Sequence, residues 1–512
     1  MDDRKDGDVT GTDVLLAVDA GTTAIKAVAF GTDGTELARA GRESEALRPA
    51  PGHVEANMTD VWERTAAAIR EVVDDLPGGA DPVGIGITGQ GDGLWAVTDD
   101  GDPAGNAMLW SDGRAAGVLE EWEADGRLAE LVDRCGSAPY PGMSLPLLAW
   151  LAREEPDRFD RVDTVLSCKD WLAFRLTGER TVDYSEATVP YLDRETERYD
   201  RSVFDLVDLP DARDVLPPLS AATEVVGTVT REAASATGLE PGLPVVPGLF
   251  DVPASAVGSG VATPGGGAVT MGTSLTHQVL VDGPRSDASG IGMALGLEGL
   301  WTYAVGSNAG TPSLDWLAET VADVDDVAAL EDVAREAPAG SDGVLYHPYL
   351  STAGERGPFV DPEARAKFLG LSPEHDTEHL VRAVYEGLSL AIRDCVSVLP
   401  EDHARVALCG GGSRSELWCQ LVADCLDRAV VVPAGSEPGA LGAAILLALA
   451  VDEYPSFEAA VASMVATDRQ YEPRAAVAAT YATLYDLFVD AREETAPVWS
   501  RRAETVRSIE DS

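Results

Sequence analysis

The chain has 512 residues with 87 acidic and 38 basic side chains, a net charge of −49, and 45% of its residues are hydrophobic. This length predicts two large domains, and the hydrophobic content is typical of a globular protein rather than a disordered one. The charge argues against nucleic acid and anionic membranes as partners, because both are polyanions that would repel the chain.

The acidic residues are spread along the chain, and only four lysines occur. Such self-repulsion is screened in concentrated salt, so we interpret the chain as the cytoplasmic protein of a halophile. The six cysteines contain no Cys-x-x-Cys pair, which predicts buried, reduced thiols. We expect no signal peptide, since the first residues are acidic and polar, and the apolar run at 440–450 is too short to cross a bilayer.

The first predicted elements are two strands joined by a tight turn. Residues 14–18 are continuously apolar, as in a buried strand, and residues 25–30 are apolar again. Between them Gly21 permits a backbone geometry that other residues resist. A third strand is expected to end at about Arg42, and a helix is expected over 59–75 with its first residue, a threonine, as N-cap.

The turn between the first two strands carries side chains suited to a nucleotide phosphate. Asp19 precedes the turn, Thr22 and Thr23 lie in it, and Lys26 follows. Free N–H groups and hydroxyls can hold phosphate oxygens, and a neighbouring carboxylate can hold Mg²⁺ directly or through water. The alternative is an ordinary hairpin whose polar residues face water.

Residues 84–89 match the G-x-G-x-x-G pattern of dinucleotide sites. We reject that function, because the glycines lie inside a predicted strand and another strand follows instead of a helix. A Walker A motif is absent. Beyond the strand come Gln90, Asp92, Trp110 and Asp112. Amide and carboxylate groups bind vicinal hydroxyls, and an indole covers the C–H face of a sugar, although two polar turns would look the same.

Residues 115–240 are rich in predicted helices, and a strand near residues 243–250 then ends at Asp251. We place the domain boundary near this point. Phosphoryl transfer to a hydroxyl requires a carboxylate that accepts the hydroxyl proton, and Asp251 is a candidate. The alternative is a helix N-cap.

The second half opens on residues 267–280, which again form strand, Gly-Thr-Ser turn and strand. This similarity to the opening hairpin suggests a duplicated architecture. Gly410, Gly411 and Gly412 separate a predicted strand from a helix, where glycines would let adenine approach the backbone, or simply allow a tight connection. The remaining predicted elements are a helix at 377–398, strands at 406–409 and 430–432, helices at 415–426 and 439–451, and a helical, acidic stretch over the last sixty residues.

Together and in this order, these segments resemble the FGGY carbohydrate kinases, a branch of the actin-like, sugar-kinase and Hsp70 ATPase superfamily. The resemblance covers about residues 13–490. It rests on Asp19-Ala20-Gly21-Thr22-Thr23 with Lys26, Gly89-Gln90-Gly91-Asp92-Gly93, Trp110-Ser111-Asp112-Gly113-Arg114, Gly248-Leu249-Phe250-Asp251, Met271-Gly272-Thr273-Ser274, and Gly410-Gly411-Gly412-Ser413-Arg414 through Trp418 and Asp424 to residues 437–444.

The resemblance implies the α/β class, with two duplicated RNase-H-like domains of the actin-like ATPase type around a central cleft. We expect a disordered acidic tail over residues 1–12 and a sugar-binding domain over 13–248. The ATP-binding domain is expected over 249–455, and helices in 456–512 are expected to pack on the core. Dimers are common in the family, so the resemblance leaves a homodimer open.

The resemblance also implies roles for the singled-out residues. ATP and Mg²⁺ would lie mostly against the second domain and the sugar or polyol mostly against the first. Asp19 would serve the metal and Asp251 would be the base. The implied ATP-binding residues are Thr22, Thr23, Gly272, Thr273, Gly410, Gly411, Gly412 and Ser413. The implied substrate-binding residues are Gln90, Asp92, Trp110, Asp112 and Asp251.

The expected substrate is inferred from positions at which this chain differs from some branches of the family. Glycerol kinases typically have Arg at the position of Gly91 and Glu at that of Asp92, and D-xylulose kinases have a Met-His pair that is absent here. The two segments Gln-Gly-Asp-Gly and Gly-Leu-Phe-Asp-Val look more like L-xylulose and erythritol kinases. We therefore expect a pentulose, ideally L-xylulose, and second a tetritol such as erythritol. A catalytically silent ATP-binding regulator is the alternative of another class, and the presence of both Asp19 and Asp251 argues against it.

Overall fold

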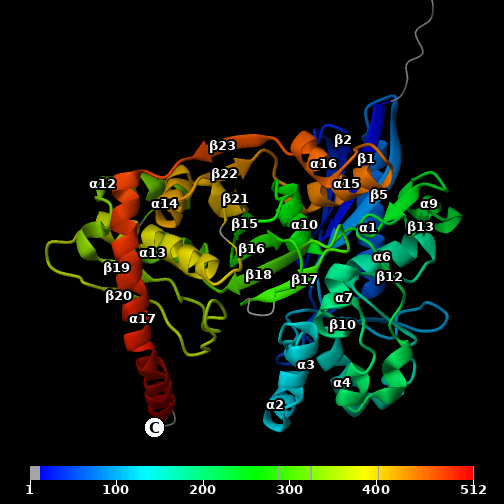
Figure 1. Ribbon diagram of the computed structural model, residues 1–512, viewed down its shortest axis with the longest axis horizontal. Helices are drawn as coiled ribbons and strands as arrows, with labels where there is room; N and C mark the ends of the chain where they lie inside the picture. The colour runs from blue at the N-terminus through cyan, green and yellow to red at the C-terminus, as the bar shows by residue number, and fades with distance from the viewer. Residues whose placement is uncertain (1–11, 286–288, 323, 325, 402, 511–512) are drawn as a thin grey trace, which may run out of the picture.

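The structure is a computed structural model that describes residues 12–510 except 286–288, 323, 325 and 402. The predicted tail lies outside the described residues, apart from Thr12, which begins the first strand. Two mixed α/β halves lie side by side, each built on its own sheet (Figure 1). The predicted class of two actin-like α/β domains is therefore confirmed.

The first sheet has six strands in the order β13-β14-β5-β1-β2-β3. Its centre is a parallel pair, β1 with β5, and β1 and β2 form the predicted antiparallel hairpin. The strands are β1 (Thr12–Ala20), β2 (Ala24–Gly31), β3 (Glu36–Glu43), β5 (Ala80–Gly89), β13 (Gly227–Thr228) and β14 (Pro244–Val246).

The second sheet has seven strands in the order β17-β18-β16-β15-β21-β22-β23. Here β15 pairs with β16 in a hairpin and with β21 in parallel, which repeats the arrangement of β1, β2 and β5. The predicted duplication is thus visible in the topology. The strands are β15 (Gly266–Met271), β16 (Leu275–Val281), β17 (Ile291–Ala294), β18 (Trp301–Ser307), β21 (Arg405–Cys409), β22 (Val430–Pro433) and β23 (Thr467–Tyr471).

Helices cover the two sheets, and short two-stranded pairs lie in the segments that connect the main elements. The helices are α1 (Met58–Asp74), α2 (Ala116–Asp125), α3 (Arg127–Cys135), α4 (Ser144–Glu154), α5 (Pro156–Phe159), α6 (Cys168–Thr177), α7 (Tyr184–Tyr191), α8 (Val203–Leu206), α9 (Arg231–Thr237), α10 (Asp251–Gly258), α11 (Pro312–Leu317), α12 (Leu330–Glu336), α13 (Thr377–Ser397), α14 (Glu416–Leu426), α15 (Pro438–Ala450), α16 (Phe457–Met464) and α17 (Ala475–Glu510). The short pairs are β4 (Glu55–Ala56) with β7 (Ala107–Met108), β6 (Trp95–Val97) with β8 (Thr164–Leu166), β9 (Val182–Asp183) with β12 (Leu219–Ser220), β10 (Leu192–Asp193) with β11 (Arg198–Tyr199), and β19 (Leu345–His347) with β20 (Lys367–Leu369).

Helices α10 and α15 pack against each other between the two halves (Figure 1). Glycines make this contact close: a Cβ on Gly258 would lie 1.9 Å from the Pro438 carbonyl oxygen, and one on Gly442 would lie 2.0 Å from that of Ala254. Because neither position tolerates a side chain, these two helices approach backbone to backbone. They form one apolar core with residues from both sheets.

Helix α15 also explains the G-x-G-x-x-G segment, which lies within β5 and is followed by β6, as expected. A Cβ on Gly86 would lie 2.4 Å from the Ala443 carbonyl oxygen, and one on Gly84 would lie 2.6 Å from the side chain of Leu447. The glycines therefore let α15 lie on the first sheet. The rejection of a dinucleotide site is consistent with this packing role.

Two predicted elements differ from the structure. Helix α1 is capped by Asn57, whose side-chain oxygen accepts from the Asp60 N–H at 3.0 Å, so the predicted Thr59 cap is wrong. The stretch after residue 456 is not wholly helical, because β23 pairs antiparallel with β22 at the edge of the second sheet. Helix α17 runs down the outer side of this half (Figure 1) and buries Tyr481 and Phe488 in its core.

All six cysteines are free and buried, as predicted. Among the helices that the structure describes, none combines the length and apolar character that a bilayer span requires.

Candidate active site

A cavity of about 760 Å³ lies between the two halves. This volume is typical of sites for small ligands. Both halves contribute polar side chains to its lining: Thr22, Asp92, Trp110, Tyr140 and Asp251 from the first, and Ser274, Thr276 and Arg356 from the second. The cavity therefore brings together residues predicted from segments far apart in the sequence.

Asp251 is the first residue of α10 and lines the cavity. The N-cap position belongs to Phe250, so the alternative that Asp251 is only an N-cap is wrong. Burial, and then the negative charges of Asp19 and Asp92, raise the pKa of Asp251 to about 7. A carboxylate with a pKa near 7 is well matched to accept a proton at neutral pH.

Asp19 lies at the end of β1 beside the first turn of α15. A Cβ on Gly439 would lie 2.6 Å from Asp19 Oδ2, so glycine is required for this approach. Burial raises the pKa of Asp19 to about 6, although Lys26 lowers it. Lys26 itself pairs with Glu437, with 2.6 Å between Nζ and Oε2. It therefore does not stand free to bind phosphate.

The surroundings of Asp19 fit Mg²⁺ bound through one carboxylate. No group of three or more His, Cys, Asp or Glu side chains able to hold a metal occurs among the described residues. Mg²⁺ does not need such a group, since it commonly uses one or two carboxylates with water and substrate phosphates. Within the described part of the chain no group donates a hydrogen bond to the Asp19 carboxylate, so its oxygens remain available.

Thr22 connects the first turn to the predicted sugar-side residues. Its hydroxyl donates to Gln90 Oε1 at 3.1 Å and accepts from Trp110 Nε1 at 3.0 Å. Thr22 and Trp110 line the cavity, whereas Gln90 is buried behind them. The neighbouring Thr23 is exposed and outside the cavity lining. Three of the predicted residues thus form one hydrogen-bonded group.

Asp92 projects into the cavity from a strained position after β5. Its φ of 59° is in the left-handed region, and its backbone N–H donates to Glu186 Oε2 at 3.0 Å. Tyr140 donates its hydroxyl to Asp92 Oδ2 at 2.6 Å, and burial raises the pKa of Asp92 to about 6. Its neighbour Gly91 is glycine for a steric reason, because a Cβ there would lie 2.4 Å from the ring of Phe250.

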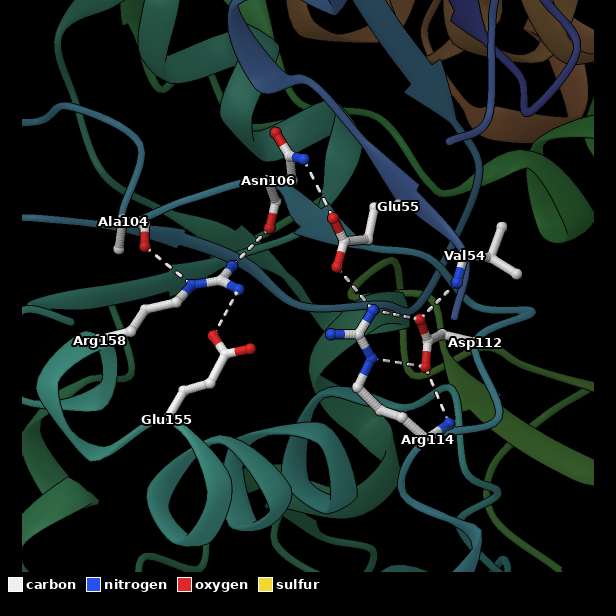
Figure 2. Close-up of polar contacts among 8 residues, drawn as sticks. All are labelled: Val54, Glu55, Ala104, Asn106, Asp112, Arg114, Glu155 and Arg158. Carbon is white, nitrogen blue, oxygen red and sulfur yellow. Dashed lines mark hydrogen bonds and ion pairs between the residues drawn. The ribbon is translucent and has the colours of Figure 1, made fainter. Parts of the chain in front are cut away.

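Asp112 is buried and lies outside the cavity lining. Figure 2 shows its carboxylate between Arg114 and the backbone of Val54. It accepts from the Val54 N–H at 2.6 Å, and its oxygens lie 2.8 and 2.9 Å from guanidinium nitrogens of Arg114. Arg114 also pairs with Glu55 at 2.7 Å, which in turn accepts from Asn106 at 3.0 Å. The structure thus does not bring Asp112 together with the other substrate-side residues. The hydrogen bonds of Asp112 instead hold in place the segment that carries Trp110.

In the second half, the turn 272–274 joins β15 to β16, and Ser274 lines the cavity. Gly410 lies against this hairpin, because a Cβ there would lie 2.8 Å from the Met271 carbonyl oxygen. The carbonyl oxygen of Gly272 accepts from the Thr311 N–H at 2.9 Å. The predicted phosphate turn and glycine loop therefore meet at the same edge of the second sheet.

The three glycines of that loop differ. Gly410 has a positive φ of 84°, and a Cβ on Gly412 would lie 2.5 Å from the ring of Trp418. Both are needed for the tight connection, which was the alternative interpretation. A Cβ on Gly411 would meet nothing within 4 Å, so its face is open. Ser413 is buried and donates its hydroxyl to the Gly410 carbonyl at 2.8 Å.

Three residues of the site were not singled out from the sequence. Tyr140 stands between two prolines in the helix-rich stretch 115–240, where no motif was recognised. Glu186 lies in the first turn of α7, which Asp183 caps, in a segment without a recognisable motif. Burial and the charge of Asp92 raise the pKa of Glu186 well above its usual range. Arg356 lies in the segment Gly-Glu-Arg-Gly-Pro, which was not recognised as a motif. The glutamate of this segment is buried in the structure.

Comparison with known proteins agrees with this arrangement. Residues 14–258 match the N-terminal domain of the FGGY family of carbohydrate kinases, and residues 267–451 match its C-terminal domain. An erythritol kinase of Brucella abortus is 33% identical over 96% of this chain and 98% of its own. A gluconokinase of Bacillus licheniformis is 26% identical over 97% of this chain and 99% of its own. The crystal structure of a xylulose kinase from Rhodospirillum rubrum superposes with a TM-score of 0.88, covering 95% of this chain and 100% of that one at 30% identity. The chain therefore belongs to the FGGY family of carbohydrate kinases.

Proposed function

We propose that this carbohydrate kinase transfers the γ-phosphoryl group of ATP to a hydroxyl of a four- or five-carbon polyol or ketose, with Asp251 as general base. The observation that carries this proposal is the position of Asp251 on the cavity between the halves with a pKa of about 7. Such a group is partly ionised at neutral pH and still basic enough to accept the hydroxyl proton.

In the proposed reaction the acceptor oxygen bonds to the γ-phosphorus as the bond to the β,γ-bridging oxygen breaks, and ADP leaves with that electron pair. The acceptor proton passes to Asp251. Asp92 and Trp110, which face the same cavity, orient the acceptor from the first half. Mg²⁺ held near Asp19 would supply neutralisation of phosphate charge when bound. The turns at Thr22–Thr23 and Gly272–Thr273, with Gly410–Ser413, are proposed to hold ATP.

The acceptor is proposed to be a tetritol or a pentulose. The relative named erythritol kinase, which matches almost the full chain, supports erythritol. The segment Gln-Gly-Asp-Gly resembles both L-xylulose and erythritol kinases and so supports either acceptor. Glycerol is disfavoured, because Gly91 abuts Phe250 and leaves no room for the arginine that glycerol kinases carry there.

The test is ADP release in molar KCl with erythritol, L-xylulose, D-xylulose, gluconate and glycerol as acceptors. We expect erythritol or L-xylulose to give a kcat/KM at least tenfold above that of the other three. Preference for gluconate or glycerol would overturn the proposed acceptor class. No acceptor-stimulated ADP release with any compound would favour the non-catalytic regulator.

A further inference from the structure

A loop of the second half carries an arginine into the cavity. Residues 353–361 are part of the connection between β19 and β20, and Arg356, Pro358 and Val360 of this loop line the cavity. Val360 is 81% exposed, so the loop lies at the open side of the cavity rather than in the core. The loop was not part of any prediction from the sequence.

The loop is held firmly behind the arginine. Glu355 is 2% exposed and accepts hydrogen bonds from the Ser307 hydroxyl at 3.1 Å and from the Asn308 N–H at 2.8 Å. The Asn308 amide donates to the Gly354 carbonyl at 3.0 Å. These bonds attach the loop to the end of β18, next to the turn that is proposed to hold phosphate.

A second anchor lies on the far side of the loop. The ring of Phe359 is stacked on Trp499 of α17 with 5.9 Å between centroids, and the guanidinium of Arg492 lies 5.0 Å from the centre of the Phe359 ring. With both ends fixed, the backbone of Arg356 has a defined place. The loop backbone is thereby pre-organised, so little backbone conformational entropy is lost when the loop contacts a ligand.

The guanidinium of Arg356 lies over β18, where its nitrogen Nη2 would be 3.0 Å from a Cβ on Gly306. Gly306 is paired across the sheet with Thr276, two residues beyond Ser274 of the phosphate turn. Thus Arg356 shares one wall of the cavity with that turn. Asp92 and Tyr140, the proposed acceptor side, come from the other half.

Arg356 is unpaired in a strongly acidic protein. In the described part of the chain no side chain or carbonyl forms a hydrogen bond or ion pair with its guanidinium. It is also the sole lysine or arginine among the described residues that line the cavity. The carboxylates Asp92 and Asp251 face the same space, and Lys26 is occupied by Glu437. Among the described residues of the lining, Asp92 and Asp251 are the acidic side chains and Arg356 is the cation that could attract a phosphoryl group.

We propose that Arg356 is a further catalytic residue that contacts the transferred phosphoryl group and stabilises its charge between ATP and the acceptor. This rests on the proposed kinase reaction, in which the acceptor oxygen replaces the β,γ-bridging oxygen on phosphorus and Asp251 takes the proton. A planar guanidinium matches two phosphoryl oxygens at once, and its charge is permanent. In other phosphoryl-transfer enzymes an arginine in this role accelerates the reaction by about 10³–10⁵-fold.

The experiment compares Arg356→Met and Arg356→Lys with wild type under saturating ATP and varied acceptor, in molar KCl. We expect kcat to fall at least about 100-fold in Arg356→Met, with the acceptor KM within threefold of wild type. Arg356→Lys should recover part of kcat, since it restores the charge without the planar fork. The matched control is Arg501→Met, an exposed arginine of α17 that bonds its own helix, which should leave both constants unchanged.

Two results would overturn the proposal. A raised acceptor KM with unchanged kcat, or a loss confined to gluconate, would mean that Arg356 binds the acceptor instead. Unchanged kinetics would mean that it has no role in the reaction.

Hydrolysis of ATP without acceptor separates this inference from the proposed function. If no compound of the panel is phosphorylated, the acceptor assignment fails. The slow transfer of the phosphoryl group to water must still decrease in Arg356→Met if Arg356 contacts that group. An undiminished hydrolysis rate would contradict the proposal on its own. Circular dichroism of each variant in the same salt identifies loss of folding, and Arg356→Lys then gives the decisive comparison.

Discussion

Lys26 Nζ lies 2.6 Å from Glu437 Oε2, an ion pair that joins β2 of the first sheet to the N-cap residue of α15. Both partners influence the neighbouring Asp19: Lys26 lowers its pKa, and Glu437 raises it. The pair therefore controls the carboxylate that is proposed to hold Mg²⁺, although neither residue need touch the metal.

Replacing Lys26 by Met should make the enzyme more dependent on Mg²⁺ in mild acid. Without the lysine the pKa of Asp19 rises further above 6, so less of it is ionised at pH 6.0 and more Mg²⁺ is needed for half-maximal activity. Glu437→Gln should have the opposite effect. Mg²⁺ titrations at pH 6.0 and 8.0 measure both. Equal Mg²⁺ requirements at pH 6.0 in the two variants would contradict this assignment of Asp19.

Replacing Gly91 by Ala should damage catalysis through Phe250. The added Cβ would lie 2.4 Å from the Phe250 ring, which immediately precedes Asp251. Overpacking of this kind typically costs about 1–3 kcal/mol, and the displaced ring would shift the base. We expect a lower melting temperature together with a reduced kcat. In Gly91→Ala/Phe250→Leu the smaller side chain should restore both, and a double variant no better than Gly91→Ala would argue against this steric explanation.

Replacing Arg114 by Met should destabilise the protein strongly. Arg114 is almost fully buried, and its loss leaves the carboxylates of Asp112 and Glu55 without their cation (Figure 2). Breaking a buried ion pair from one side typically costs about 3–5 kcal/mol. The exposed pair of Arg153 with Glu121 is the control, where Arg153→Met should change the free energy of unfolding by less than about 1 kcal/mol. Denaturant unfolding in molar KCl measures both, and similar losses in the two variants would be the contrary result.

Much of the fold follows from local sequence patterns. The strands around Asp19 are predicted because burial on both faces leaves a continuous hydrophobic run. The hairpin near residue 272 is predicted from its apolar flanks and the Gly-Thr-Ser turn, which resembles Gly-Thr-Thr in the first hairpin. Strand β23 was missed for the converse reason. Its residues Thr467–Tyr471 are largely polar and half-exposed, because it lies at the sheet edge and pairs through its backbone.

The site was predicted less completely than the fold. Asp251 and Asp92 both follow apolar strands, and Asp92 also stands between two glycines, which are visible signals of a functional loop. Asp112 has the same appearance, but its partners are Arg114 and Val54, and only the folded chain shows that its oxygens are saturated. Arg356 carries no local signal in the sequence. Its proposed role rests on its place in the cavity lining and on the lack of a hydrogen-bond or ion-pair partner for its guanidinium among the described residues.

The central claim is that Asp251 is the general base. Its pKa predicts the direction in which activity changes with pH. The ionised form must accept the proton, so kcat/KM should fall about tenfold per pH unit below about 7 and level off above it. Stability should change in the opposite sense: burial raises the pKa of Asp251 in the folded state, so the folded protein binds the proton more tightly and ionisation at higher pH destabilises it.

The most direct measurement is the pH dependence of kcat/KM for wild type and Asp251→Asn, with the better acceptor of the panel and in molar KCl. We predict a wild-type profile that bends at about pH 7 and a variant at least about 100-fold slower with no bend there. The variant should be no less stable than wild type at pH 8, because it removes a half-buried carboxylate next to Asp19 and Asp92. A variant with wild-type turnover, or one that keeps the bend near pH 7, would contradict the assignment of Asp251 as the base.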